Sequence, residues 1–334
     1  MKHAFSVLVL ISSGFLINGC GSDSSSINSG SSIDIAIPFR VVANNETIRC
    51  GETIYGLGLG NTDIKLADAR LFIHDILFVT DQNIEIPINL DAGLASQQTN
   101  IALLDFRDKI ETEEGTTEVC AENNTPNSAD NPHYNDTIHG FVTVDPAYTI
   151  SHIKFTLGVP FQKNHANQSD AIEPLRNPGL ATGMHWNWQN GYKFANFDVR
   201  PIGGVTRPLD ATWSSPKWNL HIGSTGCAIG VSDLNSGTQP EACLAPNRTI
   251  VTLPLTSINW DEIAIEFDYS ALVAMSNLAE DNGQAPGCMS GGTDPECEHI
   301  FEKLGLPWGA NEAEDQSVFS IVALSEMLHA NHAE

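Results

Sequence analysis

Alternation of apolar and polar residues is the main pattern along this chain, and it predicts β-strands. Such alternation places every second side chain on the same face of an extended backbone. It recurs in short segments separated by turns of Gly, Pro and Asn, and only the segment 272–277 has the pattern of a short helix. The expected strands are 33–42, 71–79, 141–144, 150–157, 192–199, 217–222, 248–255, 263–269 and 316–323. We therefore predict an all-β protein, a disulfide-stabilised β-sandwich with long loops.

The expected strand 71–79 contains a histidine, His74. Strict alternation places one set of side chains on the face that carries Asp75, namely Leu71, Ile73, Leu77 and Val79. The other face then carries His74 together with Phe72, Ile76 and Phe78. His74 is thus expected among apolar neighbours.

The first residues have the pattern of an export signal followed by a flexible tether. An apolar run follows Lys2 and His3, and it is too short to span a bilayer as a stable anchor. It ends at Gly19-Cys20, which resembles the cleavage site of a bacterial lipoprotein, although an ordinary signal peptide with an incidental cysteine is the alternative. The expected parts are a signal peptide at 1–19, a lipidated Ser/Gly-rich tether at 20–34, one β-rich domain at 35–323 and a tail at 324–334.

Cys20 is followed by Gly rather than Asp, which favours the outer membrane over retention in the inner membrane. The domain would then face the periplasm or the cell surface. The formal net charge of −25 argues against nucleic acid as a partner, because no basic surface is present to release phosphate counterions. Part of this charge falls in the segment 111–136, which has no Lys or Arg and is predicted to be an excursion from the domain.

Six cysteines follow Cys20, and an even number in an exported chain predicts disulfides. Two pairs are close enough in sequence to close local loops, which leaves one long-range pair. The expected pairs are Cys227 with Cys243, Cys288 with Cys297, and Cys50 with Cys120. Thiolate binding of a metal is the rival interpretation, but no Cys-x-x-Cys pair occurs in the sequence.

The segment 183–194, Gly-Met-His-Trp-Asn-Trp-Gln-Asn-Gly-Tyr-Lys-Phe, concentrates aromatic and metal-binding residue types. On extended backbone, Trp186 and Trp188 would point to one face, with His185 and Asn187 on the other. Packing in the core is the ordinary alternative, because a buried tryptophan contributes a large apolar area.

Four histidines stand where metal chemistry is plausible. They are His74 on a strand, His165 at the end of a strand, His185 beside the tryptophans and His221 before Gly-Ser-Thr-Gly-Cys. Neutral imidazole suits copper and zinc, and Met184 could add a thioether. The alternative for each is a structural histidine, buried in the core or fixing a loop by hydrogen bonds.

Enzymatic readings have less support. The stretch 223–226 places Ser224 between glycines, but it is not Gly-x-Ser-x-Gly, and no phosphate-binding loop or dinucleotide fingerprint occurs. Glycoside hydrolysis by a pair of carboxylates is a further alternative, although the sequence points to no particular pair.

Taken in order, several segments resemble the MbnP-like family, also described as metallo-mystery pair four-Cys proteins. They are 72–75 (Phe-Ile-His-Asp), 158–161 (Gly-Val-Pro-Phe) with Asn164-His165, 184–189 with 191–194, 221–227, and Cys243 with 246–248 (Pro-Asn-Arg). These segments run in order over most of the chain after the signal. Each is weak alone, and the ordered set is specific.

The resemblance implies an exported domain that binds copper as Cu(I), is not an enzyme, and is encoded beside a di-haem cytochrome c peroxidase-like partner. In the family, that partner oxidises a tryptophan of the Trp-x-Trp motif to kynurenine, which helps to create the copper site. Trp186 and Trp188 are the candidates in this chain. His74 and His221 are the first candidate ligands, followed by His165, because all three fall inside matching motifs.

His185 is a weaker candidate, because aromatic residues commonly fill its place in the family. A different class of protein also remains open: a surface-displayed structural or adhesion domain whose histidines and tryptophans only pack. That class predicts neither stoichiometric copper nor a modified tryptophan.

Overall fold

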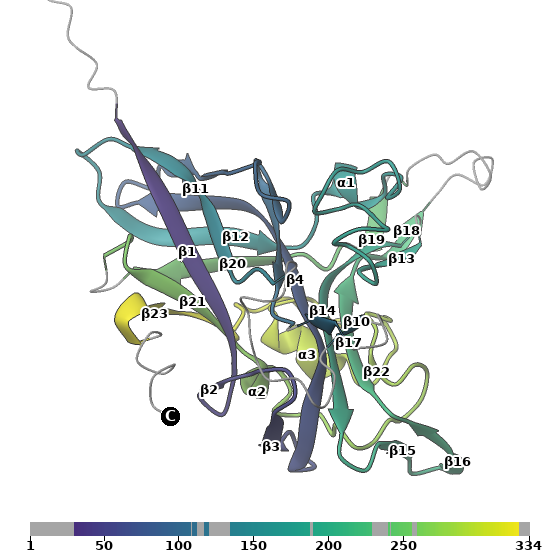
Figure 1. Ribbon diagram of the computed structural model, residues 1–334. Coiled ribbons are helices and arrows are strands. Elements are labelled where there is room, and N and C mark those ends of the chain that lie inside the picture. The colour runs from purple at the N-terminus through teal and green to yellow at the C-terminus, as the bar shows by residue number, and fades with distance from the viewer. Residues whose placement is uncertain are drawn as a thin grey trace, which may run out of the picture.

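The computed structural model describes residues 30–107, 109–111, 117–119, 134–187, 190–228, 240, 242–255 and 259–326. Strands dominate these residues, and the three helices among them are short. Two sheets pack against each other as in a sandwich (Figure 1). The predicted all-β class is therefore confirmed.

The smaller sheet has six strands in the order β23-β21-β1-β11-β6, with β2 paired to β1. Strand β1 pairs antiparallel with β11 through its first part and parallel with β21 through its last part. The strands are β1 (Ser31–Ala43), β2 (Glu46–Thr47), β6 (Asn89–Leu90), β11 (Thr137–Val144), β21 (Ile263–Asp268) and β23 (Phe319–Ala323).

The larger sheet has eleven strands along the path β20-β12-β4-β14-β17-β22, with shorter strands paired beside this path. Its longest strand is β4, which pairs with five other strands on that sheet and so positions most of the elements described below. The strands are β3 (Thr53–Leu57), β4 (Thr62–Thr80), β5 (Glu85–Pro87), β7 (Gln97–Gln98), β8 (Ile101–Asp105), β12 (Ile150–Leu157), β13 (His185–Asn187), β14 (Gly191–Pro201), β17 (Trp218–Gly223), β20 (Thr249–Pro254) and β22 (Gly287–Cys288).

Short ribbons and helices complete the described part of the chain. The ribbons pair β9 (Lys109–Glu111) with β10 (Thr117–Val119), β15 (Val205–Arg207) with β16 (Asp210–Ser215), and β18 (Thr225–Ala228) with β19 (Ala242–Ala245). The helices are α1 (Phe161–Asn164), α2 (Tyr269–Leu272) and α3 (Glu298–Lys303). Each helix has at most six residues, which is too short for a helical period to show in the sequence.

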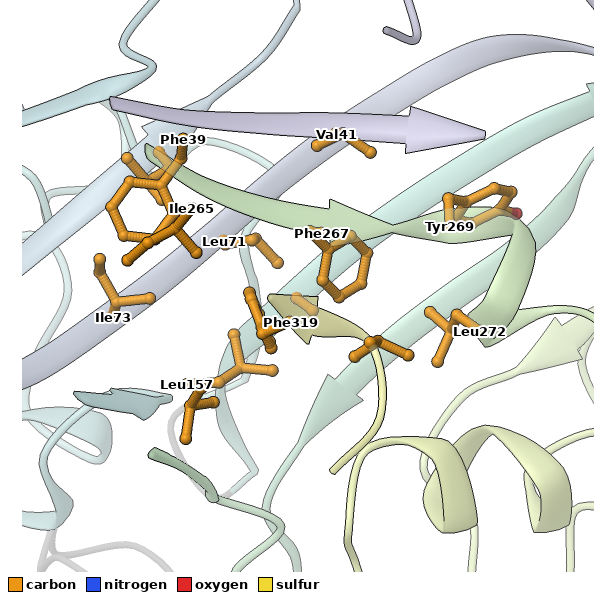
Figure 2. Close-up of a cluster of buried hydrophobic side chains, with 14 of the residues drawn as sticks. Phe39, Val41, Leu71, Ile73, Leu157, Ile265, Phe267, Tyr269, Leu272 and Phe319 are labelled. Carbon is orange, nitrogen blue, oxygen red and sulfur yellow. The ribbon is translucent and has the colours of Figure 1, made fainter. Parts of the chain in front are cut away.

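The main hydrophobic core lies between the two sheets. Leu71 and Ile73 of β4 meet Phe39 of β1 and Phe267 of β21 there, and Figure 2 shows these side chains converging. The ring of Phe197 on β14 stacks on that of Phe267, with 5.0 Å between their centroids. This face of the larger sheet is apolar throughout its centre, as a sandwich core requires.

A second, smaller hydrophobic cluster covers the opposite face of the larger sheet. Phe72 of β4 and Phe194 of β14 pack there against Leu175 and Met184, which belong to the chain between β12 and β14. The larger sheet is thus covered on both faces, by the other sheet on one face and by the irregular chain on the other.

The alternation predicted for 71–79 is broken by a β-bulge at Asp75. Between Lys154 and Thr156 of β12, strand β4 advances by one extra residue, and Asp75 has a positive φ of 50°. Ile76 and Phe78 therefore join Leu71 and Ile73 in the main core, instead of sharing the face of His74. The predicted faces are correct up to His74 and wrong beyond it, because the extra residue reverses the alternation.

Several element boundaries also differ from expectation: β4 begins at Thr62 rather than at 71, β11 at Thr137 rather than at 141, and β23 at Phe319 rather than at 316. Strand β1 begins at Ser31, so ordered structure includes the last part of the expected tether at 20–34. The helix expected at 272–277 is instead Tyr269–Leu272, so only Leu272 is common to both, and Asp268 caps it by accepting a hydrogen bond from the Ala271 N–H at 2.9 Å.

The two local disulfides are confirmed, Cys227–Cys243 and Cys288–Cys297. Cys50 is also disulfide-bonded, whereas its expected partner Cys120 lies outside the described residues, so that pairing stays a prediction. Cys20 and most of the acidic segment 111–136 lie outside the described residues as well. Among the described helices, none has the length and apolar character needed to cross a membrane.

Candidate metal centre

Strand β4 carries His74 at the point where two neighbouring strands part. β8 pairs with residues 70–74 along one flank of β4, so β14 and β12 must both lie on the other flank. β14 pairs with β4 up to Leu71, and β12 pairs with it from Ile73 onward. The chain leaves β12 at Gly158, whose N–H donates to the Phe72 carbonyl at 2.8 Å. His74 therefore lies beside a fork in the sheet.

One nitrogen of His74 is fixed by a carboxylate, and the other is free. Its Nδ1 lies 2.8 Å from Oδ2 of Asp75, the bulged residue, while Nε2 is buried without a hydrogen-bond partner. Burial lowers the pKa of His74 below its ordinary value and outweighs the opposing effect of Asp75. The imidazole is thus neutral, and an Nδ1–H donated to the carboxylate leaves the lone pair on Nε2.

His221 repeats this arrangement on β17 with the two nitrogens exchanged. Its Nε2 lies 2.8 Å from Oδ1 of Asp198 on β14, and its Nδ1 is buried without a partner. Burial opposes ionisation of Asp198, but the hydrogen bond from His221 and nearby positive charges outweigh it, so the pKa of Asp198 is lowered. The ammonium of Lys193 lies 3.4 Å from Nε2 of the same histidine.

Trp186 packs next to His221. The two rings lie 6.5 Å apart between centroids. The edge of the indole lies over Gly223, where an added Cβ would be only 2.6 Å from Cζ3 of Trp186. Gly223 therefore makes room for the indole. Trp188 lies outside the described residues, so the common face predicted for the two tryptophans stays a prediction.

His165, the residue after α1, lies beside the Cys227–Cys243 disulfide. Its Nε2 is 3.1 Å from the side-chain nitrogen of Asn164 and 3.5 Å from Sγ of Cys243. The imidazole and both sulfurs lie within 4.8 Å of one another, the only such group of three potential ligands found among the described residues. Because the sulfurs are bonded to each other, they are not thiolates, and the group is not a thiolate metal site in this form.

The structure does not bring His74, His165 and His221 together as one group of three ligands. His221 is opposite Asn196, which in turn is opposite Arg70, four residues before His74 on β4. His74 and His221 are therefore separated along β4 as well as across β14. The ligand set taken from the family resemblance stays a prediction, and the two carboxylate-fixed histidines mark two ends of the candidate region.

His185 was the weakest candidate in the sequence, and the structure gives it more weight. Both of its ring nitrogens are buried without a hydrogen-bond partner. Burial and the nearby His165 lower the pKa of His185 to about 4, so the ring is neutral at physiological pH. Its ring packs edge-on against Tyr192, with 4.9 Å between centroids. Its place directly before Trp186 was the one sequence signal that pointed to it.

Arg70 anchors the chain that leads to Trp186. Its guanidinium donates to both carboxylate oxygens of Asp68, at 2.8 and 2.6 Å, and to the Thr182 carbonyl at 2.7 Å. Asn196 donates to the same carboxylate at 2.9 Å. Because Thr182 lies four residues before Trp186, this buried network ties the approach to β13 onto the larger sheet.

The fold and this centre define a disulfide-bonded, all-β protein in which buried, carboxylate-fixed histidines line one face of a sandwich sheet. Every histidine of the centre, and Trp186, lies within residues 32–290, which match the family model described as MbnP. The chain therefore belongs to the MbnP family. It is similar to the solved structure of MbnP from Methylosinus trichosporium, with a TM-score of 0.70 and 28% sequence identity.

That similarity covers 88% of this chain and 99% of the Methylosinus trichosporium chain. Nothing among the curated protein sequences matches this chain. The resemblance drawn from the ordered motifs is confirmed by the family match.

Proposed function

We propose that this protein is an exported, non-catalytic copper-binding protein. The observation that carries the proposal is the pair of free nitrogens, Nε2 of His74 and Nδ1 of His221, each buried on a ring whose other nitrogen faces a carboxylate. Metal-binding histidines characteristically have such a carboxylate partner, which fixes the tautomer and raises the basicity of the free nitrogen.

The free nitrogens are difficult to explain by packing alone. A buried polar atom without a partner costs on the order of 1–3 kcal/mol. His74 and His221 each have one such atom, and His185 has two. A metal bound at either histidine would satisfy its free lone pair, at Nε2 of His74 or at Nδ1 of His221, so the residues present fit a bound metal. Imidazole donors suit copper and zinc, and membership of the MbnP family favours copper, held as Cu(I).

The Trp-x-Trp motif supplies the second part of the proposal. A di-haem peroxidase-like partner would oxidise Trp186 or Trp188 to kynurenine. Two equivalents of hydrogen peroxide cleave the C2–C3 bond of the indole, adding two oxygens to the ring and releasing two waters, and hydrolysis then releases C2 as formate. The product has an aniline nitrogen with a lone pair, whereas the indole N–H is only a donor. At Trp186 this nitrogen would arise beside His221.

The location follows from the first residues of the chain. Cleavage before Cys20 and lipidation of that residue would anchor the domain to a membrane, with the outer membrane favoured. Strand β1 begins at Ser31, so the residues between Cys20 and β1 would serve as the tether. The two local disulfides agree with folding outside the reducing cytosol.

Replacement of the two carboxylate-fixed histidines tests the copper site. Protein from a host that expresses the haem partner is expected to bind one copper per chain. At least one of His74→Ala and His221→Ala should lose most of this copper while keeping the far-ultraviolet circular dichroism of the wild type. His152→Ala on β12 is the matched control, because its Nδ1 is bonded to Ser151, and it should bind copper normally. Wild-type affinity in both of the first two variants would refute the ligand assignment.

Mass spectrometry tests the modification. A gain of about 4 Da, the net of one oxygen gained and one carbon lost, is expected on a peptide that contains Trp186 or Trp188. Unmodified tryptophans together with an absence of stoichiometric copper would refute the proposal and leave the structural or adhesion domain as the better description.

A further inference from the structure

Arg248 is a cation without a counter-ion next to the fork of the larger sheet. Its Nε donates to the Val159 carbonyl at 2.8 Å, and its guanidinium lies 5.8 Å from the ring of Phe161 and 5.2 Å from that of Phe194. Its Nη2 is buried without a hydrogen-bond partner. Among the described residues, no carboxylate forms an ion pair with it, although the chain has 41 acidic and only 16 basic residues.

Arg248 and His74 meet over Gly158. A Cβ added to Gly158 would lie 3.0 Å from Cγ of Arg248 and 3.6 Å from Nε2 of His74. The free nitrogen of the histidine and the arginine side chain therefore line the same small space where the chain leaves β12. A residue larger than glycine at this position would compete with both.

The charges around His74 are positive on balance. Asp75 supplies one negative charge, while Arg248 and Lys163 each supply a positive one. Lys163 donates to the side-chain oxygens of Gln98 and Asn100, which carry no charge. A net positive environment in a chain with a formal net charge of −25 requires a local explanation.

We infer that Arg248 makes the copper site select Cu(I) over Cu(II), by holding an unpaired positive charge beside the free nitrogen of His74. This inference rests on the proposed function. Cu(II) carries one more positive charge than Cu(I), so a fixed neighbouring cation repels it more strongly. At a partly buried site, one unit charge a few ångströms away changes relative affinity on the order of 10- to 100-fold.

An arginine suits this role better than a lysine. The guanidinium is a delocalised, planar cation that lies flat against aromatic rings, whereas a lysine ammonium offers no plane for that contact. The rings of Phe161 and Phe194 stabilise the cation through their electron-rich faces without neutralising it. A carboxylate partner would have removed the effect on the metal.

Three variants separate charge from structure. Arg248→Gln removes the charge and keeps a donor for the Val159 carbonyl, and Arg248→Lys keeps the charge but loses the planar contact with the rings. Arg40→Gln on β1 is the control, because Arg40 pairs with Glu266 on the other sheet. Each protein is titrated with Cu(I) against a Cu(I)-selective chelator and with Cu(II) against a Cu(II)-selective chelator.

We expect Arg248→Gln to tighten Cu(II) binding by about 10- to 100-fold relative to Cu(I). Arg248→Lys and Arg40→Gln should keep the wild-type ratio of the two affinities. Equal shifts in Arg248→Gln and Arg248→Lys would show that Arg248 acts only through packing, and an unchanged ratio in Arg248→Gln would also overturn the inference while leaving the copper site intact. Wild-type protein that binds neither ion would overturn the proposed function, and the inference with it.

Discussion

The two faces of the larger sheet are stabilised in different ways. The face toward the smaller sheet is an apolar layer in which Phe197 stacks on Phe267 and Tyr269. The opposite face mixes aromatic residues with buried ions, such as Asp68 with Arg70, and with histidines that keep a free nitrogen. Apolar area is stabilising wherever it is buried, whereas a buried polar atom must find a specific partner. The second face is therefore expected to stabilise the fold less than the first, and the candidate metal site lies on it.

The largest expected effects come from two substitutions on β14, one on each face of the larger sheet. Phe197→Ala should destabilise the fold by about 3–5 kcal/mol, because it leaves a cavity in the main core. Phe194→Ala on the opposite face should destabilise similarly and also weaken copper binding, because Phe194 packs with Phe72 in the cluster on the face that carries His74. Urea unfolding and copper titration of the folded protein measure both effects. If Phe197→Ala weakened copper binding as much as Phe194→Ala, the two faces would not be independent.

A smaller effect is expected from the carboxylate behind His221. Asp198→Asn should weaken copper binding by about 10- to 100-fold, because a neutral amide fixes the imidazole tautomer less firmly. Competition with a copper chelator measures the loss, and unfolding by urea should show a much smaller change in stability. Asp210→Asn, at an exposed position on β16, is the matched control and should bind like the wild type. Normal affinity in Asp198→Asn would separate His221 from the metal.

Between β22 and α3, the carboxylates of Asp294 and Glu296 lie close together, whereas the carboxylate of Asp68 is paired with an arginine. The first pair should make the stability of the fold depend on pH. Burial and the neighbouring Glu296 raise the pKa of Asp294 from 3.8 to about 7. As the pH rises from 3.8 to 7, the unfolded chain releases the Asp294 proton and the folded protein keeps it. Stability should therefore fall across this window.

Glu296→Gln should remove part of that fall. The amide carries no charge and can donate to the Asp294 carboxylate, so we expect a gain on the order of 1–2 kcal/mol at pH 8 and little change at pH 4. Urea unfolding at the two pH values checks this, with Glu312→Gln at an exposed position as the control. A gain of the same size at both pH values would contradict the assignment to Asp294.

The smallest effect concerns His185. His185→Phe should stabilise the protein by about 1 kcal/mol at neutral pH, because it removes two buried nitrogens that have no partner and keeps an aromatic ring against Tyr192. Thermal unfolding measures the gain, and copper binding should be unchanged. Loss of copper in this variant would instead identify His185 as a ligand and would enlarge the site.

The sequence predicted the strands well, because alternation directly reports which side chains are buried. It could not predict the bulge at Asp75, since a positive φ at a residue other than glycine leaves no mark in the pattern. The helix α1 was missed because four residues show no period. Local sequence was therefore sufficient to predict the main strands and the all-β class. It was not sufficient to predict the bulge or the short helix.

The candidate site was predictable in part for a similar reason. The carboxylate partner of His74 is its neighbour in sequence, whereas Asp198 lies 23 residues from His221 and meets it only through the pairing of β14 with β17. Arg248 appeared only as one residue of a family motif, and its lack of a counter-ion is a property of the folded chain. Long-range pairing and burial decide these features, and neither is encoded by spacing.

The bulge at Asp75 makes this exposed residue one that β4 can lose without exchanging its two faces. Substitutions there should affect chiefly the hydrogen bond to His74, because the side chain points to solvent. Because Asp75 is the extra residue, its removal would restore simple alternation along β4 and leave Ile76 and Phe78 in the main core. In a scan of insertions and deletions, loss of Asp75 should therefore remove chiefly its hydrogen bond to His74 and leave the main core intact, whereas an insertion beside it should enlarge the bulge or reverse the alternation that follows.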